Sequence, residues 1–94
     1  MKCLITVTEE DIKKGRQRSA DSCPVARAIK RKFKAVEANW YYGAGSYQYR
    51  VPSGILLSKK VRACSKKVTK FVSAFDTSRK SFDIKPFKFY VKVS

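Results

Sequence analysis

The sequence predicts a small single-domain α+β protein, in which an antiparallel sheet of about four strands is packed by two or three short amphipathic helices with basic outer faces. The length of 94 residues corresponds to one domain, spanning residues 1–94. Hydrophobic residues make up 44% of the chain, which is enough for a folded core despite the high charge. Extended and helical patterns follow one another in the order strand, helix, helix, hairpin, strand, helix, strand.

The first strand and the first helix are marked by residue type. Residues 3–7 are mostly β-branched or apolar, which favours a strand. Thr8 can cap a helix whose first turn carries three acids, and Gly15 can end it. The polar stretch that follows has no apolar period, so we expect a loop that exposes Arg16 and Arg18.

A second helix is indicated by Pro24, which suits a first helical turn, and by two side-chain stripes. The apolar stripe consists of Val25, Ile29, Phe33 and Val36. The opposite, cationic stripe consists of Arg27, Lys30, Arg31 and Lys34. One face of this helix is therefore expected to pack on the core, while the other carries positive charge.

Aromatic residues then flank a glycine-rich turn. Residues 39–42 and 46–51 favour strands, and Gly43-Ala44-Gly45 between them predicts the turn of a β-hairpin. After Pro52-Ser53-Gly54, residues 55–57 indicate a further strand.

The last helix has two possible starts, Ser58 and Ser65. Its apolar positions at helical spacing are Val61, Cys64, Val68, Phe71, Val72 and Phe75. Its cationic positions are Lys59, Arg62, Lys66 and Lys70. Residues 87–93 alternate as a final strand, with Lys88 and Lys92 on one side.

The charge balance indicates an anionic partner. There are 22 Lys and Arg against 7 Asp and Glu, a formal net charge of +15, and Glu37 is the only acid between Asp21 and Asp76. Cations at helical spacing can neutralise successive phosphates, so we expect nucleic-acid binding, DNA or RNA, whereas the alternative is a solvated surface that only maintains solubility. The candidate contacts are Arg16, Arg18, Arg27, Lys30, Arg31, Lys34, Lys59, Arg62, Lys66, Lys70, Arg79 and Lys80.

The aromatic hairpin has two interpretations. Alternation gives Tyr47 and Tyr49 a common face, on which bases of a nucleic acid would stack. Alternatively these rings fill the core, together with Trp40, because the chain offers few other large apolar side chains.

Nothing in the sequence indicates an enzyme, and we expect no catalytic residue, metal or cofactor. Cys3, Cys23 and Cys64 are widely spaced and the chain has no His, which disfavours a zinc site or a disulfide framework. Gly43-Ala44-Gly45 lacks the following helix and the lysine of a phosphate-binding loop. No apolar run suits a signal peptide or a membrane span, so we expect a cytoplasmic protein without a membrane partner.

Short patterns along the chain also resemble a family. The residues that carry the resemblance are Ile5-Thr6-Val7-Thr8, Glu10-Asp11-Ile12, Gly15, Cys23-Pro24-Val25-Ala26, Ala28-Ile29, Phe71-Val72, Phe75-Asp76 and Pro86-Phe87-Lys88-Phe89. The chain resembles a group of small uncharacterised proteins encoded by bacteriophages and some bacteria. Members often carry a second Cys where this chain has Ala20, so a paired-thiol role is not implied here.

The resemblance implies a phage-derived protein in a bacterial cytoplasm, with Ser65 as the start of the last helix, but it implies no activity. Small phage proteins often bind and disable host machinery, including nucleic-acid-guided defence complexes. An alternative function is therefore inhibition of a host protein or defence complex, in the manner of an anti-CRISPR protein. A chain of this charge would bind an acidic host protein surface or the nucleic acid of such a complex.

Overall fold

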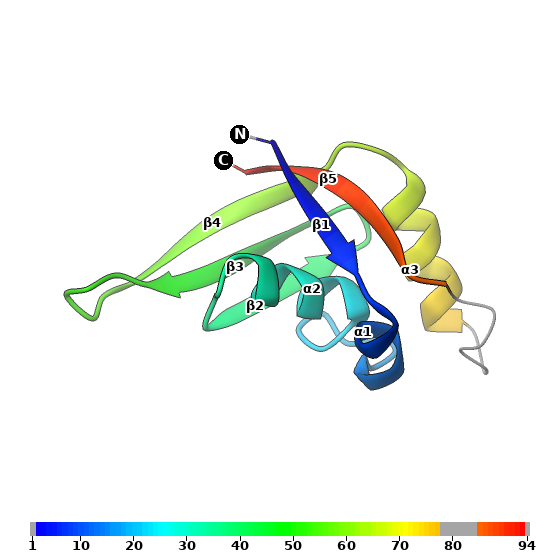
Figure 1. The fold of residues 1–94 in the computed structure, drawn as a ribbon, viewed down its shortest axis with the longest axis horizontal. Helices are drawn as coiled ribbons and strands as arrows, with labels where there is room; N and C mark the ends of the chain where they lie inside the picture. Colours follow the sequence, from blue (N-terminus) through cyan, green and yellow to red (C-terminus); the bar gives the residue numbers. More distant parts are fainter. Residues whose placement is uncertain (1, 78–84, 94) are drawn as a thin grey trace.

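The fold is an α+β domain, as predicted. The computed structural model describes residues 2–77 and 85–93 (Figure 1). In chain order its elements are β1 (Lys2–Val7), α1 (Glu9–Lys14), α2 (Pro24–Lys32), β2 (Glu37–Tyr41), β3 (Ala44–Arg50), β4 (Leu56–Ala63), α3 (Lys67–Thr77) and β5 (Phe87–Val93). The described residues form five strands rather than about four.

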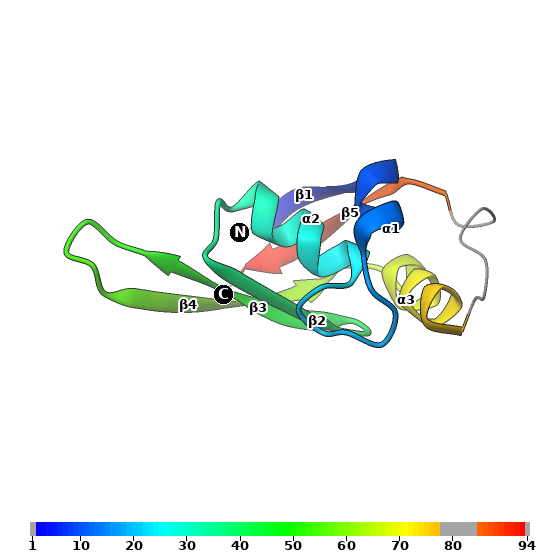
Figure 2. The same cartoon turned by 90° about the horizontal axis from the view of Figure 1, so that it is seen from below.

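The strands form one antiparallel sheet in the order β1-β5-β4-β3-β2. The helices lie on one side of this sheet, with α2 between the two edge strands β1 and β2, α1 beside α2, and α3 at one end (Figure 2). Every buried strand residue points to this side, for example Ile5, Tyr47 and Val91. The other side, which we call the open face, is covered by no helix among the described residues.

Helix α1 has the predicted cap. The Asp11 backbone N–H donates to Thr8 Oγ1 at 3.2 Å, and the Thr8 backbone N–H donates to Asp11 Oδ2 at 3.0 Å. This reciprocal pair satisfies two of the backbone donors that a helix start leaves without partners. The helix ends at Gly15, where a Cβ would lie 2.6 Å from the Asp11 carbonyl oxygen.

Helix α2 begins as predicted but ends earlier. The Cys23 thiol accepts the Ala26 N–H, and burial raises the pKa of this thiol. The C-terminal stop is a Schellman motif, in which Ala35 N–H donates to Lys30 O and Lys34 has a left-handed φ of 50°. Lys34 and Val36 therefore lie beyond the helix, and the prediction that Val36 belongs to its apolar stripe is wrong.

The hairpin turn is shifted from its predicted place. Tyr42 and Gly43 form the two-residue loop, with Tyr42 at φ 58°, while Ala44 and Gly45 already belong to β3. A side chain at position 45 would collide with the Asn39 carbonyl, so glycine is required there for close strand approach rather than for turning.

Strand β4 overturns the helical interpretation of its residues. Residues 59–62 pair with β3, and Val61, Arg62 and Ala63 pair with β5. The hydrogen bonds from two neighbouring strands outweigh the helical spacing of Val61 and Cys64. Helix α3 begins at Lys67, so the earlier predicted start, Ser58, is wrong and the later one, Ser65, lies close to the observed start.

Candidate nucleic-acid interface on the open face of the sheet

Two of the predicted phosphate contacts on α2 are paired with an acid of the same domain. Arg31 donates from Nη1 and Nη2 to the two carboxylate oxygens of Asp11, each at 2.7 Å, and from Nη2 to the Thr6 carbonyl at 2.8 Å. Arg27 Nε lies 3.6 Å from Asp11 Oδ1. Burial opposes ionisation of Asp11, but the hydrogen bond from Arg31 and those from Thr8 hold its pKa below the usual range.

The remaining cations of the predicted helix stripe, Lys30 and Lys34, are exposed. The helix layer also contains Glu9 and Glu10, and Glu10 pairs with Lys14 at 3.2 Å. Positive charge on this side is therefore interrupted by carboxylates, which weakens its potential toward a polyanion.

Acids also lie near Arg16 and Arg18, the two predicted phosphate contacts in the loop before α2. The Arg18 backbone N–H donates to Asp76 Oδ1 at 3.0 Å. Asp21 lies in the same loop, and the hydroxyl of Ser19, which donates to its carboxylate, lowers its pKa. This loop combines both signs of charge.

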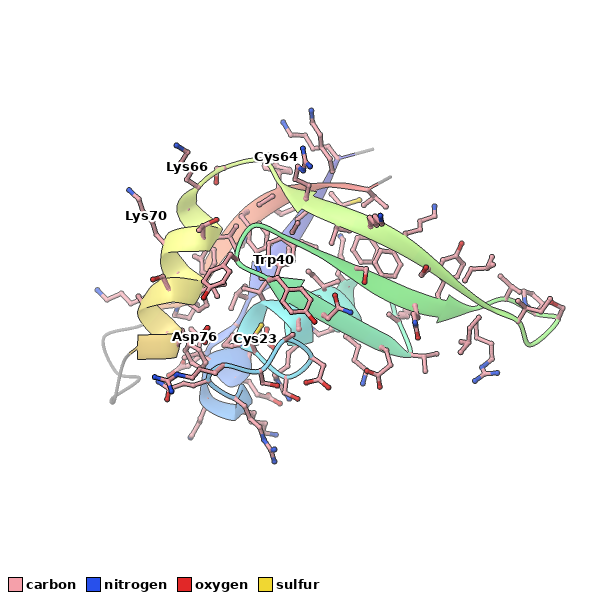
Figure 3. The ribbon with its side chains drawn as sticks, turned by 180° about the vertical axis from the view of Figure 1, so that it is seen from behind. Cys23, Trp40, Cys64, Lys66, Lys70 and Asp76 are labelled. Carbon is pink, nitrogen blue, oxygen red and sulfur yellow. The ribbon has the colours of Figure 1, made fainter. Side chains whose placement is uncertain are left out.

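The predicted cationic stripe around the last helix does not exist as a single surface. Lys59 and Arg62 lie on β4, on opposite faces of the sheet, whereas Lys66 and Lys70 project away from the molecule at α3 (Figure 3). Arg79 and Lys80 lie outside the described residues.

Tyr47 and Tyr49 share a face, as alternation predicts, but it is the face that the helices cover. Tyr47 is 7% exposed, and its ring stacks on Phe33 with centroids 4.3 Å apart. Burial raises the pKa of its hydroxyl. The Trp40 ring is buried too, and its indole N–H donates to Tyr42 O at 2.7 Å. The hypothesis that Tyr47 stacks on bases is therefore wrong, and the core interpretation holds for Tyr47 and Trp40, while Tyr49 is half-buried against the same core.

The open face carries a row of cations that sequence reasoning did not assemble. The strand registers place Arg62 of β4 beside Lys92 of β5, and Lys92 beside Lys2 of β1. All three side chains are exposed. Cross-strand neighbours on one face lie about 5 Å apart, so the row extends over roughly 10 Å.

The surroundings of this row are also cationic. Lys88 precedes Lys92 on the same face of β5, and Lys60 precedes Arg62 on the same face of β4. Among the described residues, the only acid on the open face is Glu37, on the far edge strand β2. A hollow lined in part by Lys60, Arg62 and Lys92 opens here, next to the backbone of Gly45.

An aromatic ring lies within this cationic surface. Tyr90 stands between Lys88 and Lys92 on β5, is 50% exposed, and has Lys2 Nζ 5.4 Å above its ring centroid. A second exposed ring belongs to Tyr41 of β2. Tyr41 pairs with Ala44 of β3, and Ala44 in turn pairs with Arg62 of β4. The alternation in residues 87–93 that places Lys88 and Lys92 on one side also places Tyr90 on that side. This sequence signal could therefore have predicted the position of Tyr90.

No protein-family model, curated protein or solved structure matches this chain. None of the helices in residues 2–77 and 85–93 has the length and apolar character needed to cross a membrane.

Proposed function

We propose that this protein binds nucleic acid, preferentially single strands, on the open face of its sheet, and that it catalyses no reaction there. The observation that carries the proposal is the row formed by Arg62, Lys92 and Lys2 beside the exposed ring of Tyr90. Lysine and arginine on such a surface neutralise phosphates and release counterions, which supplies affinity without sequence selection.

The aromatic residue favours single strands over duplexes. In a duplex the flat faces of the bases are stacked on one another, so a ring on a broad sheet face can reach them only when the strand is unpaired. Tyr90 would stack on a base, with Lys2 moving from the ring to a neighbouring phosphate. The nearly acid-free surroundings favour this arrangement, because none of the carboxylates in the described part of the chain lies on the open face at β1, β5 or β4.

The test is a fluorescence-anisotropy titration with labelled single-stranded RNA, single-stranded DNA and duplex DNA at two salt concentrations. The open-face variant combines Lys2→Gln, Arg62→Gln and Lys92→Gln. Its matched control combines Lys30→Gln, Lys32→Gln and Lys34→Gln, which removes the same charge from exposed positions on and after α2.

We expect the open-face variant to bind single strands about 100-fold more weakly near 0.1 M salt, with a log–log salt slope smaller by about 2, because about 0.7 counterions are released per phosphate contact. The control variant should lose far less. Equal losses in both variants would show that only net charge matters and would remove the open face as the site. If the wild-type protein binds none of the three probes, nucleic acid is not its ligand, and a protein partner becomes the leading hypothesis.

A further inference from the structure

The β3–β4 hairpin extends well beyond the rest of the sheet. β2 pairs with β3 only as far as Gln48, and β5 pairs with β4 only at Val61, Arg62 and Ala63. Residues 49–59 therefore form a two-stranded arm that projects from the body of the domain (Figures 1 and 2). Such an arm has outer edges with backbone groups that no neighbouring strand pairs.

The direction of the backbone groups on β4 follows from the hydrogen bonds near its ends. The Cys64 N–H donates to the Tyr90 carbonyl of β5, whereas the Ile55 carbonyl accepts the Val51 N–H from the β3 side. Successive residues of a strand point their backbone groups to alternate sides. Leu56 and Ser58 thus direct N–H and C=O away from β3, toward the side where no described strand lies.

Apolar side chains accompany this open edge. Ile55, Leu56 and Leu57 are consecutive and exposed, at 61%, 45% and 44%. Leu57 is paired with Tyr49, whose ring lies 6.0 Å from that of buried Tyr47. The arm therefore continues the apolar core outward onto a surface that no described element of this chain covers, and three consecutive exposed aliphatic residues indicate a docking surface.

The chemistry of the edge changes along its length. Leu56 and Leu57 lie toward the tip, one on each face, while Lys59 and Lys60 follow them toward the body, again one on each face. Residues 49–59 contain no acid. A complementary strand would accordingly carry aliphatic residues opposite the leucines and carboxylates opposite the lysines.

We propose that the open edge of β4 at residues 56–59 accepts an extended segment of a partner protein as an added strand, and that this segment carries adjacent acidic and aliphatic residues. Backbone hydrogen bonds to Leu56 and Ser58 would supply affinity, and the side-chain pattern would supply selectivity. An antiparallel addition, like every other pairing in this sheet, requires the order acidic, acidic, one residue opposite Ser58, aliphatic, aliphatic. This proposal does not depend on nucleic-acid binding by the open face.

The probe is a short synthetic peptide containing Glu-Glu-Ser-Val-Val, whose serine lies opposite Ser58, compared with one containing Lys-Lys-Ser-Val-Val. The readouts are binding affinity and amide hydrogen exchange of the ¹⁵N-labelled protein. We expect the acidic peptide to bind at least tenfold more tightly than the basic one and to slow exchange at Leu56 and Ser58. Equal binding of the two peptides, or binding without protection of these two amides, would overturn the proposal.

Two variants separate strand addition from other modes of binding. Ser58→Pro removes the outward N–H but no hydrogen bond to β3, and Ser58→Ala is its matched control; only the proline variant should lose peptide binding, by tenfold or more. Leu56→Glu, at an exposed position where folding is not at risk, should weaken the acidic peptide similarly. Unchanged affinity in both Ser58→Pro and Leu56→Glu contradicts the model. If a single-stranded RNA oligonucleotide, rather than the peptide, protects the amides of Leu56 and Ser58, the arm belongs to a nucleic-acid interface instead.

Discussion

The cations on the two faces of the sheet have different neighbouring charges. On the helix-covered side, Arg27 and Arg31 surround the buried carboxylate of Asp11, and their charge is used within the domain. On the open face, Arg62 and Lys92 stand among other cations. The difference teaches that net charge alone does not tell which cations are accessible to a ligand, whereas the positions of the few acids do.

The same contrast holds for the tyrosines. Tyr47 and Tyr90 both lie in strands with alternating patterns, but α2 covers the first and no described helix covers the second. Tyr47 contributes to stability by packing on Phe33, whereas half of the Tyr90 surface remains accessible to a ligand. Three substitutions test whether the two faces divide stability and binding in this way.

The largest effect is expected for Asp11→Ala. The change removes the Asp11 half of the capping box and leaves Arg31 and Arg27 without their carboxylate, so the free energy of unfolding should fall by about 3 kcal/mol, at the low end for a broken ion pair because the Arg31 side chain is half exposed. Urea denaturation measures this loss. Nucleic-acid affinity of the folded variant should stay within about twofold of wild type, as binding on the opposite face predicts.

The stability lost in Asp11→Ala should depend on pH, and the lowered pKa of Asp11 sets the direction of that dependence. Because the pKa of Asp11 is lowered in the folded state, its stabilising contribution is complete above the unfolded pKa of about 3.9 and disappears as the pH falls through the folded pKa. The difference in unfolding free energy between wild type and Asp11→Ala should therefore shrink between neutral pH and strong acid. A constant difference would mean that packing, and not the ionised carboxylate, stabilises α1 and α2.

A smaller effect is expected for Tyr90→Ala. Loss of one stacked base should weaken binding of single strands about tenfold. The free energy of unfolding should change little, because the Tyr90 side chain is half exposed. Tyr90→Phe keeps the ring and should bind nearly as wild type does. Anisotropy titration distinguishes the two variants, and equal weakening of both would mean that the hydroxyl, rather than stacking, makes the contact.

The smallest effect is expected for Lys34→Gly. Lys34 follows α2 in a left-handed conformation that glycine adopts without strain. The free energy of unfolding of the variant should therefore be about 1 kcal/mol higher than that of wild type. If Lys34 lies outside the interface, single-strand affinity should change only by the small effect of one distant charge, and Lys32→Gln provides that reference. A tenfold loss of affinity in Lys34→Gly alone would place the helix side in the interface.

Local signals in the sequence were sufficient for much of the fold. Thr8 starts the first helix and Pro24 the second through their effects on the next few residues, and alternation in residues 87–93 places Lys88 and Lys92 on one face. These features depend on neighbours in the chain, so spacing alone predicts them.

Long-range pairing determined what the sequence did not predict. The residues of β4 satisfy helical and extended spacing about equally, and only its pairing with β3 and β5 selects the strand. Which face α2 covers is likewise a tertiary choice; it buries Tyr47 and leaves Tyr90 accessible. The row of Arg62, Lys92 and Lys2 combines three strands, so no sequence window contains it.

The insertion of β5 between β1 and β4 has a consequence for folding. Lys2 and Lys92 come from opposite ends of the described chain and become neighbours only when β5 occupies its place, a contact of high sequence separation that forms slowly. A partly folded chain without this strand does not bring Arg62, Lys92 and Lys2 together. A ligand on the open face would then bind the native state alone, and would raise the apparent stability of the protein in proportion to the logarithm of its concentration.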